Sequence, residues 1–206
     1  MPGSDPISRW LSRRKDRRKY AQWLRRGRPM PPPHLAKQRV VQAFADRYRL
    51  EVFVETGTFQ GNMVEAVKRW FGEVYSIELS GELYARAARR FSGDAHVHIL
   101  HGDSGKLLAE LVESLTRPTL FWLDGHYSGG RTARGDKDTP VSEELEAILR
   151  HPVPGHVVLI DDARLFTGRN DYPTLERLEE TVLDRHPDHR FEVDTDIIRI
   201  HRQPAQ

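Results

Sequence analysis

Short β-favouring runs alternate with helical patterns along most of this chain. The runs expected to form strands cover residues 52–55, 74–78, 97–100, 119–124 and 157–161, and the helical patterns between them cover 61–71, 83–91, 106–114 and 142–149. Strands that alternate with helices predict a parallel sheet with helices on both faces. The nearly continuous apolar character of the segments LFWLD and VVLID fits central strands that are buried on both sides.

The C-terminal part departs from this alternation. After a helical pattern over 174–184, the segment RFEVDTDIIRIHR holds two β runs separated only by residues 194–196. A connection this short forces an antiparallel hairpin, because a parallel crossover needs about a dozen residues. The predicted fold is therefore an α/β, doubly wound, mostly parallel Rossmann-like sheet of about seven strands that ends in an antiparallel hairpin.

Composition limits the domain count and the chemistry. A chain of 206 residues with 38% hydrophobic content suffices for one sizeable core and is short for two. The absence of cysteine excludes disulfides, thiolate metal sites and cysteine nucleophiles. No run of about 18 apolar residues is present, and the basic N-terminus lacks the apolar stretch of a secretory signal. These features predict a soluble, cytoplasmic protein.

A basic arm precedes the body of the chain. Residues 1–30 hold ten Lys or Arg against two acids, whereas the remainder holds 22 basic and 28 acidic side chains. The arm's propensities allow a helix, and the segment PMPPPH ends it, so we expect a basic N-terminal helical arm with a proline-rich linker over 1–33 and one domain over 34–206. The arm could lie on an anionic membrane surface, on nucleic acid or on an acidic partner. Alternatively, it is a solvated helix whose aromatics pack on the body or on the second subunit of a homodimer.

An acidic residue stands at or just after nearly every predicted parallel strand. Because ligands of such sheets gather at the carboxyl ends of the strands, we expect these side chains to surround one site. The acids are Glu55, Glu78, Asp103, Asp124, Asp161 and Asp162.

The segment VFVETGTFQGN places two glycines four residues apart after the first strand. A nucleoside-triphosphate loop would need Lys after Gly61, where this chain has Asn62. A dinucleotide turn would have a glycine near Phe59 to let the backbone approach a pyrophosphate, so the bulky side chain disfavours that ligand. The inferred ligand is adenosine-like and free of phosphate, and Glu78 at the end of the second strand is placed to accept hydrogen bonds from the ribose hydroxyls.

These residues resemble the class I S-adenosylmethionine-dependent methyltransferases over about residues 52–202. The first motif of that family is normally E/DxGxGxG, and ETGTFQG keeps Glu55, Gly57 and Gly61 while Phe59 replaces the middle glycine. The resemblance implies an S-adenosylmethionine cofactor whose methionine part lies by the turn, whose ribose is bound by Glu78, and whose adenine amine meets Asp103. The implied cofactor-binding residues are Glu55, Thr56, Gly57, Thr58, Phe59, Gly61, Glu78, Asp103, Ser104 and Asp124.

The segments LDGHYSGG and LIDDAR look most like the bacterial small-molecule and sugar O-methyltransferases related to macrocin methyltransferase. That resemblance implies a magnesium ion held by Asp124, Asp161 and Asp162. The class I resemblance also implies that Asp124 faces the methyl group and the substrate. His126, two residues beyond, is a candidate general base because its pKa suits proton transfer near neutrality. Helix capping and a salt bridge to Arg164 are the alternative roles for the acidic pair.

The leading hypothesis is methyl transfer to a hydroxyl of a small molecule, sugar or glycan, as in natural product or glycan modification. Two rim loops, 126–140 and 165–173, are expected to complete the acceptor pocket. A second hypothesis is a nucleic-acid methyltransferase that uses the basic arm, but LDGHY lacks an NPPY-like base-methylation motif, so nucleic acid is the less favoured acceptor. A third is a non-catalytic binding module that retained the fold.

Overall fold

The structure is a computed structural model that describes residues 6–125 and 139–202, with the backbone alone for residues 6–13. Its strands are β1 (Val52–Thr56), β2 (Glu73–Glu78), β3 (Val97–His101), β4 (Thr119–Leu123), β5 (Val157–Ile160), β6 (His189–Asp194) and β7 (Ile197–Arg202). Its helices are α1 (Pro6–Arg25), α2 (His34–Tyr48), α3 (Asn62–Val67), α4 (Gly81–Arg90), α5 (Ser104–Ser114), α6 (Val141–Arg150) and α7 (Leu175–Arg185), with a short 3-10 turn η1 (Ala163–Leu165).

The strands form one seven-stranded sheet in the order β3-β2-β1-β4-β5-β7-β6. The first five strands are parallel, and β7 runs antiparallel to both β5 and β6. This arrangement confirms the predicted doubly wound sheet with its terminal antiparallel hairpin. The chain reverses its winding direction between β1 and β4, the position at which sheets of this kind bind ligands.

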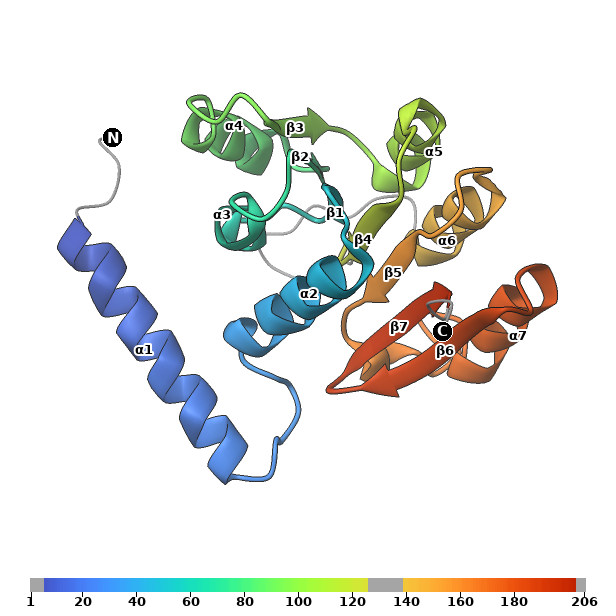
Figure 1. Cartoon of the computed structure of the whole chain (residues 1–206), viewed down its shortest axis with the longest axis horizontal. Coiled ribbons are helices and arrows are strands. Elements are labelled where there is room, and N and C mark those ends of the chain that lie inside the picture. The colour runs from blue at the N-terminus through green and yellow to red at the C-terminus, as the bar shows by residue number, and fades with distance from the viewer. Residues whose placement is uncertain (1–5, 126–138, 203–206) are drawn as a thin grey trace.

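Helices cover both faces of the sheet, as Figure 1 shows. Alternation along each strand directs Phe53 and Trp122 to one face, in a core with α2, α3 and α4, and Val54 and Phe121 to the other, in a core with α5, α6 and α7. The central strands β1 and β4 are buried along their whole length. Burial on both faces explains why their sequences are nearly continuously apolar.

The hairpin between β6 and β7 turns through two residues, Thr195 and Asp196, one fewer than expected. Both have a positive φ, 58° and 62° respectively, as a two-residue turn that matches the twist of the strands requires. The Asp196 carboxylate accepts a hydrogen bond from the Arg164 N–H at 2.9 Å. The turn therefore contacts the segment that follows β5, at the edge where the acids gather.

Two helices differ from expectation. The predicted helix over 61–71 stops at Val67. The N–H groups of Gly72 and Glu73 both donate to the Glu51 carbonyl, and these hydrogen bonds start β2 in place of a further helical turn. The helix α2 was not predicted as a separate element. Its buried residues Val41, Phe44 and Ala45 recur at helical spacing and pack on the sheet.

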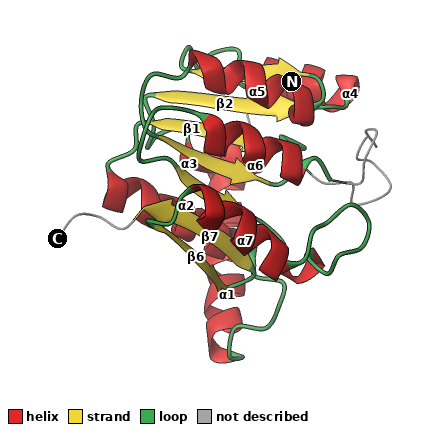
Figure 2. Cartoon of the chain, turned by 90° about the vertical axis from the view of Figure 1, so that its right-hand side faces the viewer, coloured by secondary structure: helices red, strands yellow, loops and turns green. Residues whose placement is uncertain are grey.

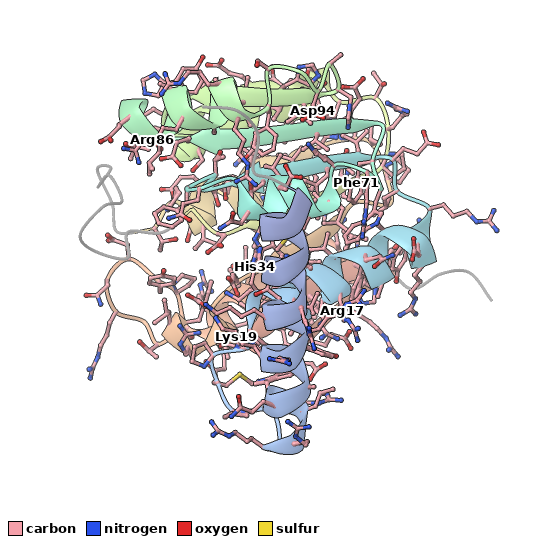
Figure 3. The ribbon with its side chains drawn as sticks, turned by 90° about the vertical axis from the view of Figure 1, so that its left-hand side faces the viewer. Arg17, Lys19, His34, Phe71, Arg86 and Asp94 are labelled. Atoms are coloured by element: carbon pink, nitrogen blue, oxygen red, sulfur yellow. The ribbon has the colours of Figure 1, made fainter. Side chains whose placement is uncertain are left out.

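The arm forms the helix α1, which stands beside the face covered by α2 and α3 (Figures 1 and 3). Its C-terminal half is anchored. The buried Trp23 donates its indole N–H to the Pro29 carbonyl at 2.8 Å, and the Arg39 guanidinium of α2 lies 4.4 Å from the centre of the Tyr20 ring. The Tyr20 contact thus joins α1 to α2, whereas the Trp23 hydrogen bond fixes the linker to the end of α1. No helix in the described ranges combines the length and the apolarity needed to cross a membrane.

Candidate functional site

The carboxyl ends of the five parallel strands meet at one edge of the sheet (Figure 2). Backbone hydrogen bonds join the residues that follow the strands. The Asp124 N–H donates to the Thr56 carbonyl at 3.1 Å, and the Asp161 N–H donates to the Leu123 carbonyl at 3.0 Å. The acids predicted from their place in the sequence therefore lie along the same edge of the sheet.

The turn after β1 requires glycine at position 57. Gly57 has a φ of 85°, and a Cβ there would lie 2.5 Å from the Asp124 carbonyl oxygen. Gly61 has a φ of 70°, and its Cβ would lie 2.6 Å from the buried Phe91 ring. The first glycine lets the turn pass against the end of β4, and the second lets α3 start against α4.

Phe59 sits between these glycines in the left-handed region, with a φ of 48°. Its backbone N–H donates to Glu78 Oε2 at 2.7 Å, while Glu78 Oε1 accepts the Ser80 N–H at 2.9 Å. The Phe59 ring is 40% exposed, whereas Glu78 is 6% exposed. Glu78 therefore holds the shape of the turn through the Phe59 backbone, and the ring is left at the surface of the site, where the flank of a ligand is one predicted contact.

Glu55 lies beneath the turn rather than on its surface. The Ser76 hydroxyl donates to Glu55 Oε2 at 2.6 Å and lies 2.6 Å from the Thr58 hydroxyl. Burial raises the pKa of Glu55 well above its usual value, and the nearby Asp124 and Glu78 raise it further. The chain from Glu55 to Thr58 braces the glycine turn from below, and Ser76 is a member that the sequence did not reveal.

At the next strand ends, Asp103 caps α5 by accepting the Gly105 N–H at 3.0 Å, and Ser104 is the first residue of that helix. Ser104 hydrogen bonds to Glu144 of α6, whose carboxyl is 1% exposed and has one oxygen, Oε1, without a hydrogen-bond partner among the described residues. Burial raises the pKa of Glu144 to about 7. Glu144 is a buried acid at the site that the sequence did not single out.

This raised pKa predicts a pH-dependent effect of Glu144→Gln. An acid whose pKa is about 7 when folded and 4.5 when unfolded favours unfolding increasingly as the pH rises between those values, by up to about 3 kcal/mol. Glu144→Gln removes that term, so we expect it to raise the melting temperature relative to wild type at pH 8, with the difference shrinking toward pH 5. Thermal denaturation at both pH values measures this. The exposed neighbour Glu143→Gln is the control, and an equal difference at both pH values would contradict the prediction.

After β5, Asp161 and Asp162 face basic residues. The Lys37 ammonium, on α2, donates a hydrogen bond to Asp161 Oδ2 and lies 3.6 Å from Asp162 Oδ1. Arg164 donates to Asp162 Oδ1 at 2.8 Å, as the alternative salt-bridge role predicts, and also pairs with Asp196. Burial raises the pKa of Asp161, and the nearby Asp124 carboxylate raises it further even though Lys37 opposes the shift.

The predicted magnesium ligands do not fit an ion as they lie in the structure. A divalent ion needs its oxygen ligands gathered around one point, at about 2.0 to 2.6 Å from it. Within residues 6–125 and 139–202, the one set of three or more candidate ligand atoms within 4.8 Å of one another comes from His186, Asp188 and His189, which are not among the predicted ligands. The aspartates Asp124, Asp161 and Asp162 form no such set, so the magnesium prediction finds no support here.

One further side chain of α2 reaches the site. His34 hydrogen bonds to the backbone of Asn62 at the start of α3 and interacts electrostatically with Asp124 and with Asp16 of the arm; Figure 3 shows it beside α1. Asp124 therefore faces basic or polar groups of α2. The predicted general base, His126, lies outside the described residues, as does most of the first predicted rim loop.

The fold is shared with known methyltransferases, although no family model and no curated protein matches the sequence. TomG, an O-methyltransferase from Streptomyces achromogenes involved in tomaymycin synthesis and solved with SAM, superposes with a TM-score of 0.60 at 19% identity, over 90% of this chain and 87% of that one. An O-methyltransferase from Bacillus cereus, solved with SAH, gives 0.61 at 15% identity over 85% and 84%.

A third protein with the same fold is an RNA methyltransferase. The 23S rRNA methyltransferase ErmE superposes with a TM-score of 0.52 at 16% identity, over 80% of this chain and 68% of that one. The chain thus has the fold of the class I S-adenosylmethionine-dependent methyltransferases, with O-methyltransferases among the structures that share it. The fold alone does not select the acceptor.

Proposed function

We propose that this protein transfers a methyl group from S-adenosylmethionine to a hydroxyl group of a small molecule, sugar or glycan. The observation that carries this proposal is Glu78. Its carboxylate ends β2, is nearly buried, and accepts the N–H of Phe59 in the turn that begins the site. A carboxylate fixed beside such a turn suits the two hydroxyls of an adenosine ribose, whereas the bulky residue in the turn disfavours a pyrophosphate.

The charge of the site supports the same ligand. Burial raises the pKa of Glu55, and the nearby Glu78 and Asp124 raise it further, so Glu55 favours its neutral form and the carboxylates of Glu78 and Asp124 supply the negative charge beside the turn. A surplus of carboxylates attracts a cation and repels a phosphate group. A sulfonium cofactor carries a positive charge at the reacting atom, so this surplus favours S-adenosylmethionine over a nucleotide.

The residues around Asp124 have roles in the proposed reaction. When bound, S-adenosylmethionine would supply an activated methyl group to the acceptor oxygen and would leave as the neutral thioether S-adenosylhomocysteine. The acceptor's proton passes to a carboxylate, for which Asp124 is the candidate. The Gly57 turn, which passes against the end of β4, would hold the donor beside Asp124 and so help to align it with the acceptor.

Calorimetry with S-adenosylmethionine and S-adenosylhomocysteine tests the proposal directly. We expect both to bind at micromolar concentration. The absence of binding by either compound at high micromolar concentration would refute the cofactor assignment. Binding without transfer to any of a panel of hydroxylated acceptors would instead favour a non-catalytic binding module.

The arm favours a polyanionic acceptor as the second candidate function. Eight basic side chains are exposed on the described part of α1 and the turn after it, namely Arg14, Lys15, Arg17, Arg18, Lys19, Arg25, Arg26 and Arg28, and Figure 3 shows Arg17 and Lys19 on α1. If the arm binds RNA, the affinity for a structured RNA should fall steeply and log-linearly with salt, and removal of residues 1–33 should abolish it. Transfer to a small acceptor that survives this truncation would favour the leading proposal.

A further inference from the structure

Lys37 of α2 supplies a positive charge to the acidic residues that follow β4 and β5. Lys37 donates a hydrogen bond to Asp161 Oδ2 and lies 3.6 Å from Asp162 Oδ1. The Lys37 side chain is 17% exposed and that of Asp161 is 1% exposed. Charges this buried are retained only with a close partner, because removal from water costs several kcal/mol per ion. Lys37 and Asp161 are therefore a fixed pair and not a surface contact.

A single ammonium pairs with two of the three predicted metal ligands, Asp161 and Asp162. Lys37 also interacts electrostatically with Asp124, so its charge is shared among the acids after β4 and β5. Arg164 supplies a second positive charge from the opposite side, bound to Asp162 and to Asp196. A divalent ion held by Asp161 and Asp162 would have to share Asp161 Oδ2 and Asp162 Oδ1, the oxygens that these two basic side chains already use.

The position of Lys37 follows from the fold. It lies one helical turn into α2, on the same side as His34. The helix packs on the face of the sheet that carries Phe53 and Trp122, which directs its first turn toward the ends of β4 and β5. Lys37 and Asp161 are 124 residues apart in sequence, so only the packing of α2 brings them together.

We propose that Lys37 takes the place of a divalent cation in this site, as a fixed positive charge that positions Asp161 and Asp162 beside the acceptor. Lys37 is a positioning residue in this scheme, since it acts through the two carboxylates. The proposed reaction then proceeds without a bound metal. This inference deepens the proposed methyl transfer and rests on it for the catalytic part, whereas the statement about cation binding stands independently.

Cation titration tests the independent part. Wild type and Lys37→Ala are dialysed against EDTA and titrated with Mn²⁺, followed by calorimetry and by electron paramagnetic resonance of the free ion. We expect no saturable binding to wild type at millimolar Mn²⁺. Lys37→Ala should bind Mn²⁺ at least about tenfold more tightly than wild type, because removal of the adjacent positive charge strengthens the attraction of the Asp161 and Asp162 carboxylates for a cation.

Two further variants make the result specific. Lys37→Met removes the charge at nearly constant volume, is expected to raise the affinity for Mn²⁺ in the same direction, and replaces Lys37→Ala if the latter does not fold. Lys68→Ala is the matched control, because Lys68 is also partly buried between two carboxylates, Glu65 and Asp94, away from the site. It should leave Mn²⁺ binding unchanged. Binding to wild type as tight as to Lys37→Ala would overturn the proposal, as would no gain in either Lys37 variant.

Activity provides the second measurement, once an acceptor is known. Transfer by wild type should be unchanged after EDTA dialysis. Lys37→Ala should lose at least about tenfold in kcat with little change in KM for S-adenosylmethionine, and Mn²⁺ should restore part of that loss. Loss of wild-type activity with EDTA would overturn the proposal. Failure of the protein to bind S-adenosylmethionine would instead refute the proposed function and leave the titration interpretable.

Discussion

Gly57→Ala should destabilise the protein by roughly 2 to 5 kcal/mol and abolish detectable binding of S-adenosylhomocysteine. Two costs add at this position. An alanine is strained at a φ of 85°, and its Cβ would lie 2.5 Å from the Asp124 carbonyl oxygen and 2.9 Å from its carbon. Both of those atoms are backbone at the end of the central strand β4, so relief requires β1 and β4 to separate where the ligand is proposed to bind.

Two other glycines separate these costs. Gly27 has a φ of 77° with nothing within 4 Å of a built Cβ, and Gly93 has neither a positive φ nor a close neighbour. Gly27→Ala therefore measures the conformational cost alone, and Gly93→Ala should be nearly neutral. Chemical denaturation gives the free energy of unfolding for all three variants. A Gly57→Ala protein no less stable than Gly27→Ala would show that the approach to β4 does not matter.

The fold could be predicted because its signals are local. Each central strand is an apolar run that ends in an acid or a glycine, and the connection before Ile197 is too short for anything but a hairpin. Boundaries were less certain. The helix expected to continue to Phe71 stops at Val67. The Gly72 and Glu73 N–H groups, at the start of β2, donate instead to the Glu51 carbonyl before β1, and these hydrogen bonds override helix propensity.

The candidate site was predictable only in part, because a local pattern places the residues at strand ends but not a contact between distant elements. Residues at strand ends converge whenever the strands are parallel, so Glu78 and Asp124 could be placed together from the sequence. Lys37 could not, because no local pattern states which strand the first turn of a helix will meet. The helix α2 itself was not predicted, although its buried residues recur at helical spacing, and only the three-dimensional packing shows that it carries a cation to Asp161.

The sequence also could not distinguish the roles of the two buried glutamates at the ends of β1 and β2, Glu55 and Glu78. The sequence places Glu55 beside the ligand, yet its carboxyl is 2% exposed and is bound by the Ser76 hydroxyl. Because side chains alternate along a strand, Glu55 faces the α2 side and Thr56 the α5 side, whereas residues at or beyond the last position of a strand lie at the edge of the sheet. We infer that the acids directly contacting ligand are those just beyond the strands or at their last position, with Glu78 foremost.

Glu78→Ala should reduce the affinity for S-adenosylhomocysteine at least about 100-fold, because hydrogen bonds to a charged group contribute about 1.5 to 3 kcal/mol each and the proposed ribose contacts are two. The variant also leaves the N–H groups of Phe59 and Ser80 without their present acceptor, so part of the loss reflects a disordered turn.

A cofactor analogue without the ribose hydroxyls separates the loss of the ribose contacts from the loss of the turn's shape. Wild type should discriminate strongly against the 2′,3′-dideoxy form of S-adenosylhomocysteine, whereas Glu78→Ala should bind both forms about equally. Glu82→Ala, which removes only an exposed helical pair with Arg86, should bind like wild type. If Glu78→Ala still preferred the natural ribose by the wild-type factor, Glu78 would support the turn without touching the cofactor.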